Sequence, residues 1–262
     1  MFVAARGIAQ PDTDKHGADL ERGTETLAAL PTTESDDLSA TTGKAISLIE
    51  HCNEVRAWAE SFTNRAGLSR SRSDDVVLAA FLHDPGKADP RFQNFLAGGD
   101  PYGPDTSEPL AKSGQAHLAP GAWAHAGLPP NWRHEALSVR LAILHPEFAK
   151  AHDPTLVLWL IGTHHGYGRP LFPHADPLDF AKRRLELPPE LGGVLTLESA
   201  PGPQSLAFDF EGQDWTHLFE RLKEKYGLWG LACLEAFVRL ADHRASEEGA
   251  PPRAARPYSE AV

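Results

Sequence analysis

The sequence predicts an all-α domain, organised as a helical bundle, and three observations favour that fold class. Apolar residues recur at alternating steps of three and four along most of the chain, which is the period of an amphipathic helix. Stretches rich in glycine and proline separate these periodic segments. Only residues 192–212 alternate instead and turn at a Pro-Gly-Pro, which is typical of a small β-hairpin inserted into the bundle.

The first predicted helix covers residues 44–64. Its apolar face is formed by Leu48, Cys52, Val55, Ala59 and Phe62. A second helix is predicted to begin near Ser73, a good capping residue, and to run to Asp84. Residues 98–132 are rich in Gly and Pro and are predicted to form a long irregular loop. The other helices are predicted at 88–96, 133–145, 154–165, 176–186, 214–225 and 228–246.

The composition fits one globular domain with loose ends. The chain has 262 residues, of which 41% are hydrophobic and 23% charged. Residues 1–42 show no apolar period, so we interpret them as a disordered leader or linker. Residues 250–262 are predicted to be a disordered C-terminal tail, which leaves 43–249 as the folded domain.

The net charge of −11 argues against a general nucleic-acid binder, which usually has a basic face. However, residues 1–42 hold eight Asp and Glu against three Lys and Arg, which accounts for −5 of that total. Two bound divalent cations would add about +4 at a site. The charge of the whole chain therefore does not exclude a phosphodiester substrate.

The sequence predicts a cytoplasmic protein. No segment reaches the ~20 apolar residues that a membrane helix needs, so no membrane association is expected. The N-terminus has neither the basic start nor the apolar centre of a signal peptide. Cys52 and Cys233 form no metal-binding spacing, and so few cysteines indicate a reducing compartment.

A set of histidines and aspartates falls at inward-facing helix positions, several of them at helix ends. Asp84, for example, extends the apolar stripe of Val77 and Ala80, where a lone carboxylate is costly unless it is paired or neutralised. A single histidine on an apolar face is more often a hydrogen-bonded core residue than a ligand, so the prediction depends on the whole set. Imidazole and carboxylate groups suit transition ions such as Mn, Fe, Co, Ni or Zn. The seven candidates are His51, His83, Asp84, His134, His164, His165 and Asp242.

Four stretches of the sequence together resemble a known family. They are LHDPGKADPRFQ (82–93), RHEALS (133–138), IGTHHGYGRP (161–170) and RLADHRAS (239–246). Their order is similar to that of the HD metal-dependent phosphohydrolase superfamily. More narrowly, it resembles the HD nuclease domain of the CRISPR type I effector helicase–nuclease, over about residues 44–248. The resemblance implies an HD-domain helical bundle.

The resemblance also implies a centre of two divalent ions, Mn, Fe, Co or Ni, with Mg as a further option. His51, His83, Asp84 and Asp242 would hold the first ion. His134, His164 and His165 would hold the second ion, with Asp84 as the bridge. Asp84 and Lys87 would be the catalytic residues, with Lys87 beside the scissile phosphate; the other interpretation of Lys87 is a solvated loop lysine. Pro85 departs from the aliphatic residue often found at its position.

The partners implied by the resemblance are single-stranded DNA, a superfamily 2 helicase and the CRISPR surveillance complex. No Walker motif occurs in this chain, so the helicase is expected in a separate chain or in a missing domain. Two basic clusters, at 65–72 and 182–184, could follow a DNA strand or could be ordinary solvated faces. Phe92, Trp132 and Tyr167 could stack on bases or belong to the core.

Two other functions remain open from the sequence. The chain could be an HD phosphohydrolase acting on small nucleotides or cyclic dinucleotides. It could also be a degenerate HD domain that serves as a scaffold, although all seven ligand candidates are present. If the chain is the nuclease that the resemblance implies, the expected reaction is metal-dependent endo- or exonuclease cleavage of single-stranded DNA, by two-metal hydrolysis of phosphodiester bonds.

Overall fold

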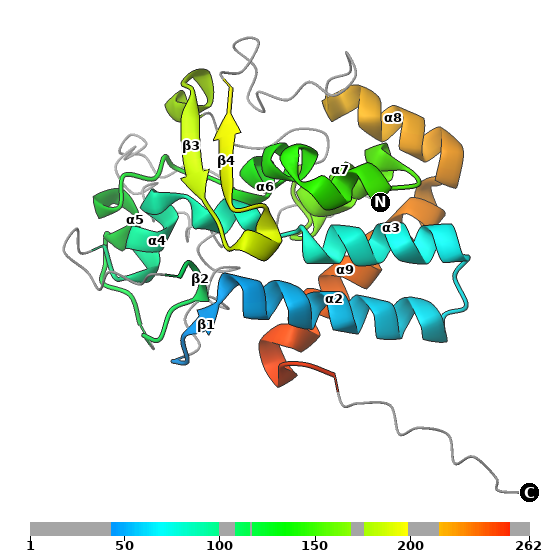
Figure 1. Ribbon diagram of the computed structural model, residues 1–262, viewed down its shortest axis with the longest axis horizontal. Helices are drawn as coiled ribbons and strands as arrows, with labels where there is room; N and C mark the ends of the chain where they lie inside the picture. Colours follow the sequence, from blue (N-terminus) through cyan, green and yellow to red (C-terminus); the bar gives the residue numbers. More distant parts are fainter. Residues whose placement is uncertain (1–42, 100–107, 116, 169–175, 199–214, 252–262) are drawn as a thin grey trace, which may run out of the picture. The chain divides into compact units, whose positions relative to one another are not determined.

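The computed structural model describes residues 43–99, 108–115, 117–168, 176–198 and 215–251, which all lie in one compact unit, Thr33–Val262 (Figure 1). The described part is mostly helical, with eight α-helices and two small two-stranded sheets, so the predicted all-α class is confirmed. The predicted leader at 1–42 and most of the predicted tail at 250–262 lie outside the described residues.

Three helices pack against one another: α2 (Leu48–Arg65), α3 (Arg70–Phe81) and α9 (Leu228–Glu248). Helix α9 crosses the pair formed by α2 and α3 (Figure 1). The predicted apolar face of α2 is buried apart from Phe62, which is partly exposed. Ser47 caps α2 by accepting a hydrogen bond from the Glu50 backbone N–H, which satisfies one free donor of the first turn. This packing brings together helices α2 and α9, which are far apart in the sequence.

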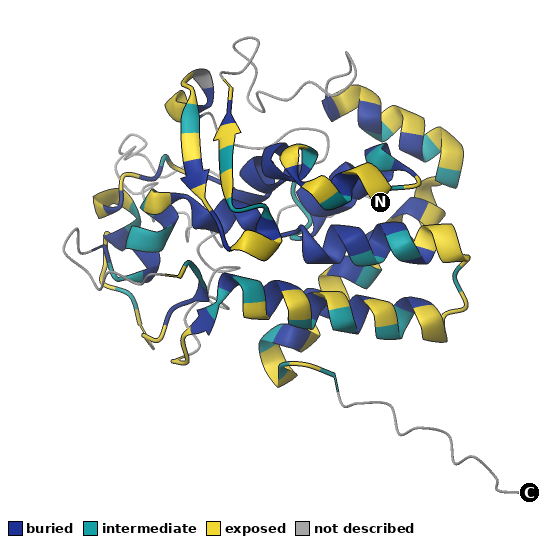
Figure 2. Ribbon diagram, viewed as in Figure 1, coloured by how far each residue is buried: buried dark blue, intermediate teal, exposed yellow. Residues whose placement is uncertain are grey.

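A second group of helices completes the core. Helices α6 (His134–Leu144) and α7 (Pro154–Thr163) pack on each other, and α7 also contacts α3 and α8 (Trp215–Tyr226). Every residue of α7 from Thr155 onward is buried, and α6 is buried over most of its length (Figure 2). Helix α7 is therefore an interior element, and its C-terminal end lies inside the protein.

The segment after α3 differs from the prediction. The second helix begins at Arg70 and ends at Phe81, not at Asp84. Pro85 explains the early end, because proline disfavours α geometry in the residue before it. A 3-10 turn, η3 (Pro85–Ala88), follows, and then the short helix α4 (Pro90–Leu96), close to the helix predicted at 88–96.

Gly86 is required for the close packing of η3 against α6. Its φ is not positive. A side-chain carbon there would overlap the carbonyl oxygen of His134 and lie 2.9 Å from the backbone nitrogen of Ser138. The Gly86 N–H donates to Ser138 Oγ at 2.9 Å, which holds η3 against α6.

The predictions for 98–132 and 176–186 are partly wrong. The loop contains strand β2 (Leu110–Lys112), which pairs antiparallel with β1 (Ile46–Ser47), and the short helix α5 (Ala122–His125). The predicted helix at 176–186 is instead a 3-10 turn, η5 (Pro177–Phe180), followed by strand β3 (Arg183–Glu186).

The predicted hairpin has a different partner strand. β4 (Val194–Leu197) pairs with the preceding strand, β3, in an antiparallel arrangement from Arg183↔Leu197 to Glu186↔Val194. The turn between them contains η6 (Pro189–Leu191) and Gly192, whose φ of +104° favours glycine. Residues 199–212 of the predicted hairpin lie outside the described residues.

The buried apolar side chains form one core cluster. Trp159 of α7 stacks on Trp215 and Phe219 of α8 with ring centroids 5.0 Å away in both cases, so the aromatic packing fixes α8 on α7. The 3-10 turn η4 (Pro146–Lys150) links α6 to α7. Among the described helices, none combines the length and the apolar character needed to cross a bilayer.

Candidate metal centre

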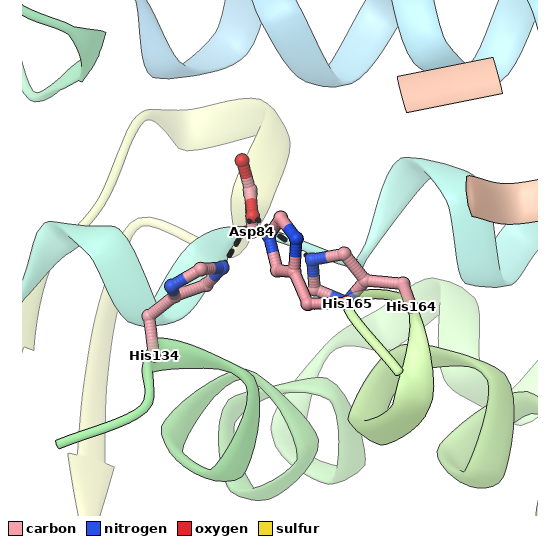
Figure 3. Close-up of side chains that lie close together, drawn as sticks. All are labelled: Asp84, His134, His164 and His165. Atoms are coloured by element: carbon pink, nitrogen blue, oxygen red, sulfur yellow. Dashed lines mark ion pairs between the residues drawn. The ribbon is translucent and has the colours of Figure 1, made fainter. Parts of the chain in front are cut away.

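The side chains of the seven predicted ligands form one cluster centred on Asp84, although they come from five separate segments. Groups of three or four, each member giving one ligand atom, lie within 4.8 Å of one another. Figure 3 shows the largest group, with three imidazoles directed toward Asp84. The groups are Asp84 with His134, His164 and His165; His51 with His83 and Asp84; and His83 with His164 and Asp242.

The two oxygens of Asp84 face two different sets of histidines. Oδ1 lies 3.0 Å from His134 Nε2 and 3.6 Å from His164 Nε2. Oδ2 lies 3.2 Å from His83 Nε2 and 3.5 Å from His51 Nε2. One fully buried carboxylate thus stands between two sets of imidazoles, which is the arrangement that a bridging ligand needs.

Backbone carbonyls orient two of the imidazoles. His83 Nδ1 lies 2.8 Å from the carbonyl oxygen of Ala80, and His164 Nδ1 lies 2.6 Å from that of Ile161. If Nδ1 donates in each pair, Nε2 keeps its lone pair and points into the cluster. Both carbonyls belong to the last turn of a helix, so the helix ends themselves set the tautomers.

The α2–α9 contact supplies a further pair. His51 Nε2 lies 3.0 Å from Asp242 Oδ1, and the two residues are 191 positions apart in the sequence. Their side chains are buried between helices that pack tightly, so each depends on the other helix for its position.

Glu135 is a member of the site that the sequence analysis did not assign. It is completely buried, and Arg133 donates to it through Nε and Nη2, at 3.0 and 2.6 Å to Oε1. Its Oε2 lies 3.5 Å from His134 Nδ1, opposite the nitrogen that faces Asp84. Arg133 in turn lies over the ring of Tyr167, 3.8 Å from its centroid. The RHEALS stretch was the signal for Glu135, because it places a charged pair on both sides of His134.

The carboxylates of the centre are held ionised. Burial alone would raise the pKa of Asp84, but the charges of His83 and Lys87 hold it well below its usual range. Burial acts on Asp242 in the same way and is outweighed by His51. Burial also acts to raise the pKa of Glu135, but the charge of Arg133 and those of the neighbouring histidines together outweigh it and hold the pKa below its usual range. Three anionic groups are thus kept in the interior.

Burial and neighbouring charges shift the pKa of three histidines, His51, His83 and His165. Burial lowers the pKa of His51 and of His165, so both are neutral near pH 7, as metal ligands must be. Burial also acts to lower the pKa of His83, but the charge and hydrogen bond of Asp84 together with the charge of Asp242 outweigh it, so the net shift is upward.

Unpartnered polar atoms show that the residues fit a metal ion. Among the described residues, several buried nitrogen and oxygen atoms of the cluster have no partner in hydrogen-bonding geometry, which is costly in a protein interior. Imidazole nitrogen and carboxylate oxygen are the donors that divalent transition ions prefer. These atoms are Oδ1 of Asp84 and Nε2 of His83, His134, His164 and His165.

Lys87 lies in the centre and is not a solvated loop lysine. Its side chain is 6% exposed, and Nζ lies 2.8 Å from Asp84 Oδ2. Gln93 of α4 donates to the Lys87 carbonyl oxygen at 2.6 Å and thereby fixes η3.

The predicted substrate surfaces have mixed outcomes. Phe92 and Trp132 are buried and belong to the core, whereas Tyr167 is partly exposed beside the histidines. Arg70 and Arg72 are exposed on α3, which leaves this basic cluster available to solvent. In the other cluster, Arg183 is paired with Asp89 at 2.9 Å.

A helical domain that gathers an adjacent His-Asp pair and further histidines around one buried carboxylate belongs to the class of HD-type metal-dependent hydrolases. The comparison with protein families narrows this class. Residues 35–249 match the family described as Cas3, HD domain, so the chain belongs to the Cas3 HD domain family and is an HD-type nuclease domain with a His/Asp metal site. This membership implies association with the Cas3 helicase and the CRISPR machinery. Searches of curated proteins and of solved structures found no match.

Proposed function

We propose that the chain cleaves single-stranded DNA in CRISPR type I interference, in the cytoplasm, by two-metal hydrolysis of phosphodiester bonds. It would work with a superfamily 2 helicase that supplies the strand, as part of the CRISPR surveillance machinery. Family membership supports the setting, and the metal-site cluster supports the chemistry.

The observation that carries the proposal is the position of Asp84. Its two oxygens face separate histidine sets, so one residue can bridge two ions, which a single imidazole cannot do. In this assignment His51, His83 and Asp242 would complete one ion site with Asp84. The other site would be completed by His134, His164 and His165, which form one of the close groups with Asp84. The ions would be Mn, Fe, Co, Ni or Mg.

The residues of the chain have distinct tasks in this mechanism. A bound pair of divalent ions would lower the pKa of a shared water and stabilise the attacking and leaving oxygens of the phosphodiester. Asp84 is held ionised, so it can accept cations without first losing a proton. Lys87 keeps an ammonium beside Asp84 and would face the non-bridging oxygens as negative charge develops on them. The backbone contacts of His83 and His164 keep their rings oriented throughout.

The proposal is tested with the full 262-residue chain and circular single-stranded DNA, in Mn²⁺ or Ni²⁺ without a helicase. We expect the wild-type chain to cut the circle and the Asp84→Asn variant to lose at least about 10²-fold in rate. The Asp74→Asn variant is the matched control, because Asp74 is partly exposed and pairs with Arg70 on the surface, away from the centre. It should cut as the wild type does.

The same assay separates the other functions. Deoxynucleoside triphosphates and cyclic dinucleotides are offered in place of DNA under the same conditions. If the chain hydrolyses these nucleotides and leaves DNA intact, it is a small-nucleotide phosphohydrolase and not a nuclease. If no substrate is cleaved and the protein binds no metal, the chain is a scaffold.

A further inference from the structure

Lys112 is a buried lysine that has no assigned role in the centre. It lies on β2, within the segment predicted to be irregular, and it is 1% exposed. Its Nζ has no hydrogen-bond partner within the described ranges. A buried ammonium without a partner is costly, so its presence calls for a function.

Two sets of backbone contacts connect the strand of Lys112 to segments that carry metal ligands. Lys112 pairs with Ile46 across the β1–β2 sheet, and β1 leads directly into the helix that carries His51. Gln93 forms hydrogen bonds to both backbone groups of Leu110 and also to the Lys87 carbonyl oxygen. The strand of Lys112 is thus tied to the segment that carries Asp84 and Lys87.

The charges that act on Lys112 are mostly those of the centre. Burial is the largest cause that lowers its pKa, to about 8, and the like charge of Lys87 adds to it. Asp242, Asp84 and Glu54 act in the opposite direction. Lys112 therefore shares the electric field of the metal ligands without contacting a carboxylate in any described ion pair.

The effect of the Lys112 charge depends on whether the centre holds metal ions. Without ions, the ammonium groups of Lys87 and Lys112 offset the carboxylates of Asp84 and Asp242. Two divalent ions would add about +4 and make the same centre strongly positive. In that state an extra ammonium repels the cations and attracts an anionic phosphodiester, because both effects follow from one charge that acts on the same centre.

We infer that Lys112 is a positioning residue that sets the charge of the centre, weakening the binding of divalent cations and strengthening the binding of the phosphodiester. This inference rests on the proposed function for its substrate. It predicts that loss of the charge changes two affinities in opposite directions, whereas simple damage to the site would weaken both.

The test uses Lys112→Met, which keeps the length of the side chain and removes its charge. Mn²⁺ binding is measured by calorimetry, and inorganic phosphate is then titrated into the Mn²⁺-loaded protein. We expect Mn²⁺ to bind about tenfold more tightly and phosphate about tenfold more weakly than in the wild type. DNA cleavage should fall by about tenfold or more in kcat/KM. Weakening of both affinities, or no change in either, overturns the inference.

Two further variants complete the design. Lys112→Arg keeps the charge and should restore both affinities toward those of the wild type. Lys150→Met removes an exposed lysine that pairs with Glu147, and it should change neither affinity. Lys112→Gln repeats the measurement with a polar side chain if the Met variant does not fold, as checked by circular dichroism.

The outcome is separable from that of the proposed function. If the wild-type chain fails to cut DNA, the proposed function fails. The Mn²⁺ and phosphate titrations still decide whether Lys112 sets the charge of the centre, because neither titration requires turnover.

Discussion

At the scale of residues, the centre combines ionised groups that would each be costly if buried alone. Asp84, Asp242 and Glu135 are all buried, and each has a cationic or imidazole neighbour at 3.5 Å or less. Glu135 and Arg133 form a compact pair next to His134, on the side away from Asp84. Such outer contacts orient a ligand and raise its basicity, so they belong to the site although they touch no substrate.

Substitution Glu135→Gln should weaken metal binding and the fold together. We expect metal affinity to fall by about 10- to 100-fold, because His134 loses the carboxylate beside its Nδ1. The free energy of unfolding should fall by about 3–5 kcal/mol, because a buried ion pair loses one member. Calorimetry and urea unfolding measure the two effects. The double variant Arg133→Met/Glu135→Gln should recover part of the stability, and no recovery would contradict the pairing.

Lys112 should make the stability of the metal-free protein depend on pH in the alkaline range. Its pKa in the folded state is about 8, below the ordinary 10.5, so folding disfavours its charged form. The free energy of unfolding should therefore be lowest below pH 8 and should rise as pH increases from about 8 to 10.5. The groups acting on it are Lys87, Asp242, Asp84 and Glu54.

The measurement compares urea unfolding of the wild type and Lys112→Met in a chelator across this pH range. We expect the gap between the two curves to change by about 3 kcal/mol, the equivalent of the pKa difference. If the two curves run parallel, the pKa of Lys112 is the same in the folded and unfolded states, and the prediction is wrong.

At the scale of elements, the site depends on where helices end. Helix α3 ends at Phe81, so His83 and Asp84 lie in a turn that can aim both side chains inward. Helix α6 begins at His134, and α7 ends just before His164. The turn η3 reaches α6 only because Gly86 has no side chain.

Substitution Gly86→Ala should separate η3 from α6 and disrupt the centre. The new methyl group would overlap the His134 carbonyl oxygen and crowd Ser138, and both are backbone contacts that cannot rotate away. We expect a loss of about 1–3 kcal/mol in the free energy of unfolding, together with weaker metal binding. Thermal unfolding and calorimetry measure these.

The matched control is Gly230→Ala in α9. There the new carbon meets only Tyr226 Cβ, at an ordinary 3.8 Å. The same substitution in this helix should stabilise the protein by up to about 1 kcal/mol. Equal effects at both glycines would contradict the packing argument.

At the scale of the whole molecule, the centre joins segments that are distant in the sequence. Its ligands come from α2, the α3–η3 turn, α6, the end of α7 and α9. Bound ions would therefore cross-link most of the described domain, and binding should stabilise the folded state as a unit.

Metal removal should accordingly lower the unfolding temperature of the full chain. At a free Mn²⁺ concentration 100 times its Kd, a single site adds about 2.7 kcal/mol to the free energy of unfolding. A chelator should abolish this gain, and the Asp84→Asn variant should show little of it. A full Mn²⁺-dependent shift in that variant would place the ions elsewhere.

Much of the fold and of the site could be predicted from local pattern. The helices at 154–165 and 228–246 were predicted within a few residues, because burial imposes a helical period on their apolar residues. The seven candidate ligands could be named because imidazoles and carboxylates on apolar faces stand out. The strand at 183–186 was missed, because its pairing with β4 comes from contacts that no local period records.

The sequence by itself determined the helical class, the order of the His and Asp residues and the presence of Lys87 beside Gly86, since these follow from residue type and spacing. Tertiary structure decided which atoms meet. The two faces of Asp84, the support of His134 by Glu135 and the burial of Lys112 each depend on elements far apart in the chain. Their distances are set by the packing of the core, and no local pattern contains that information.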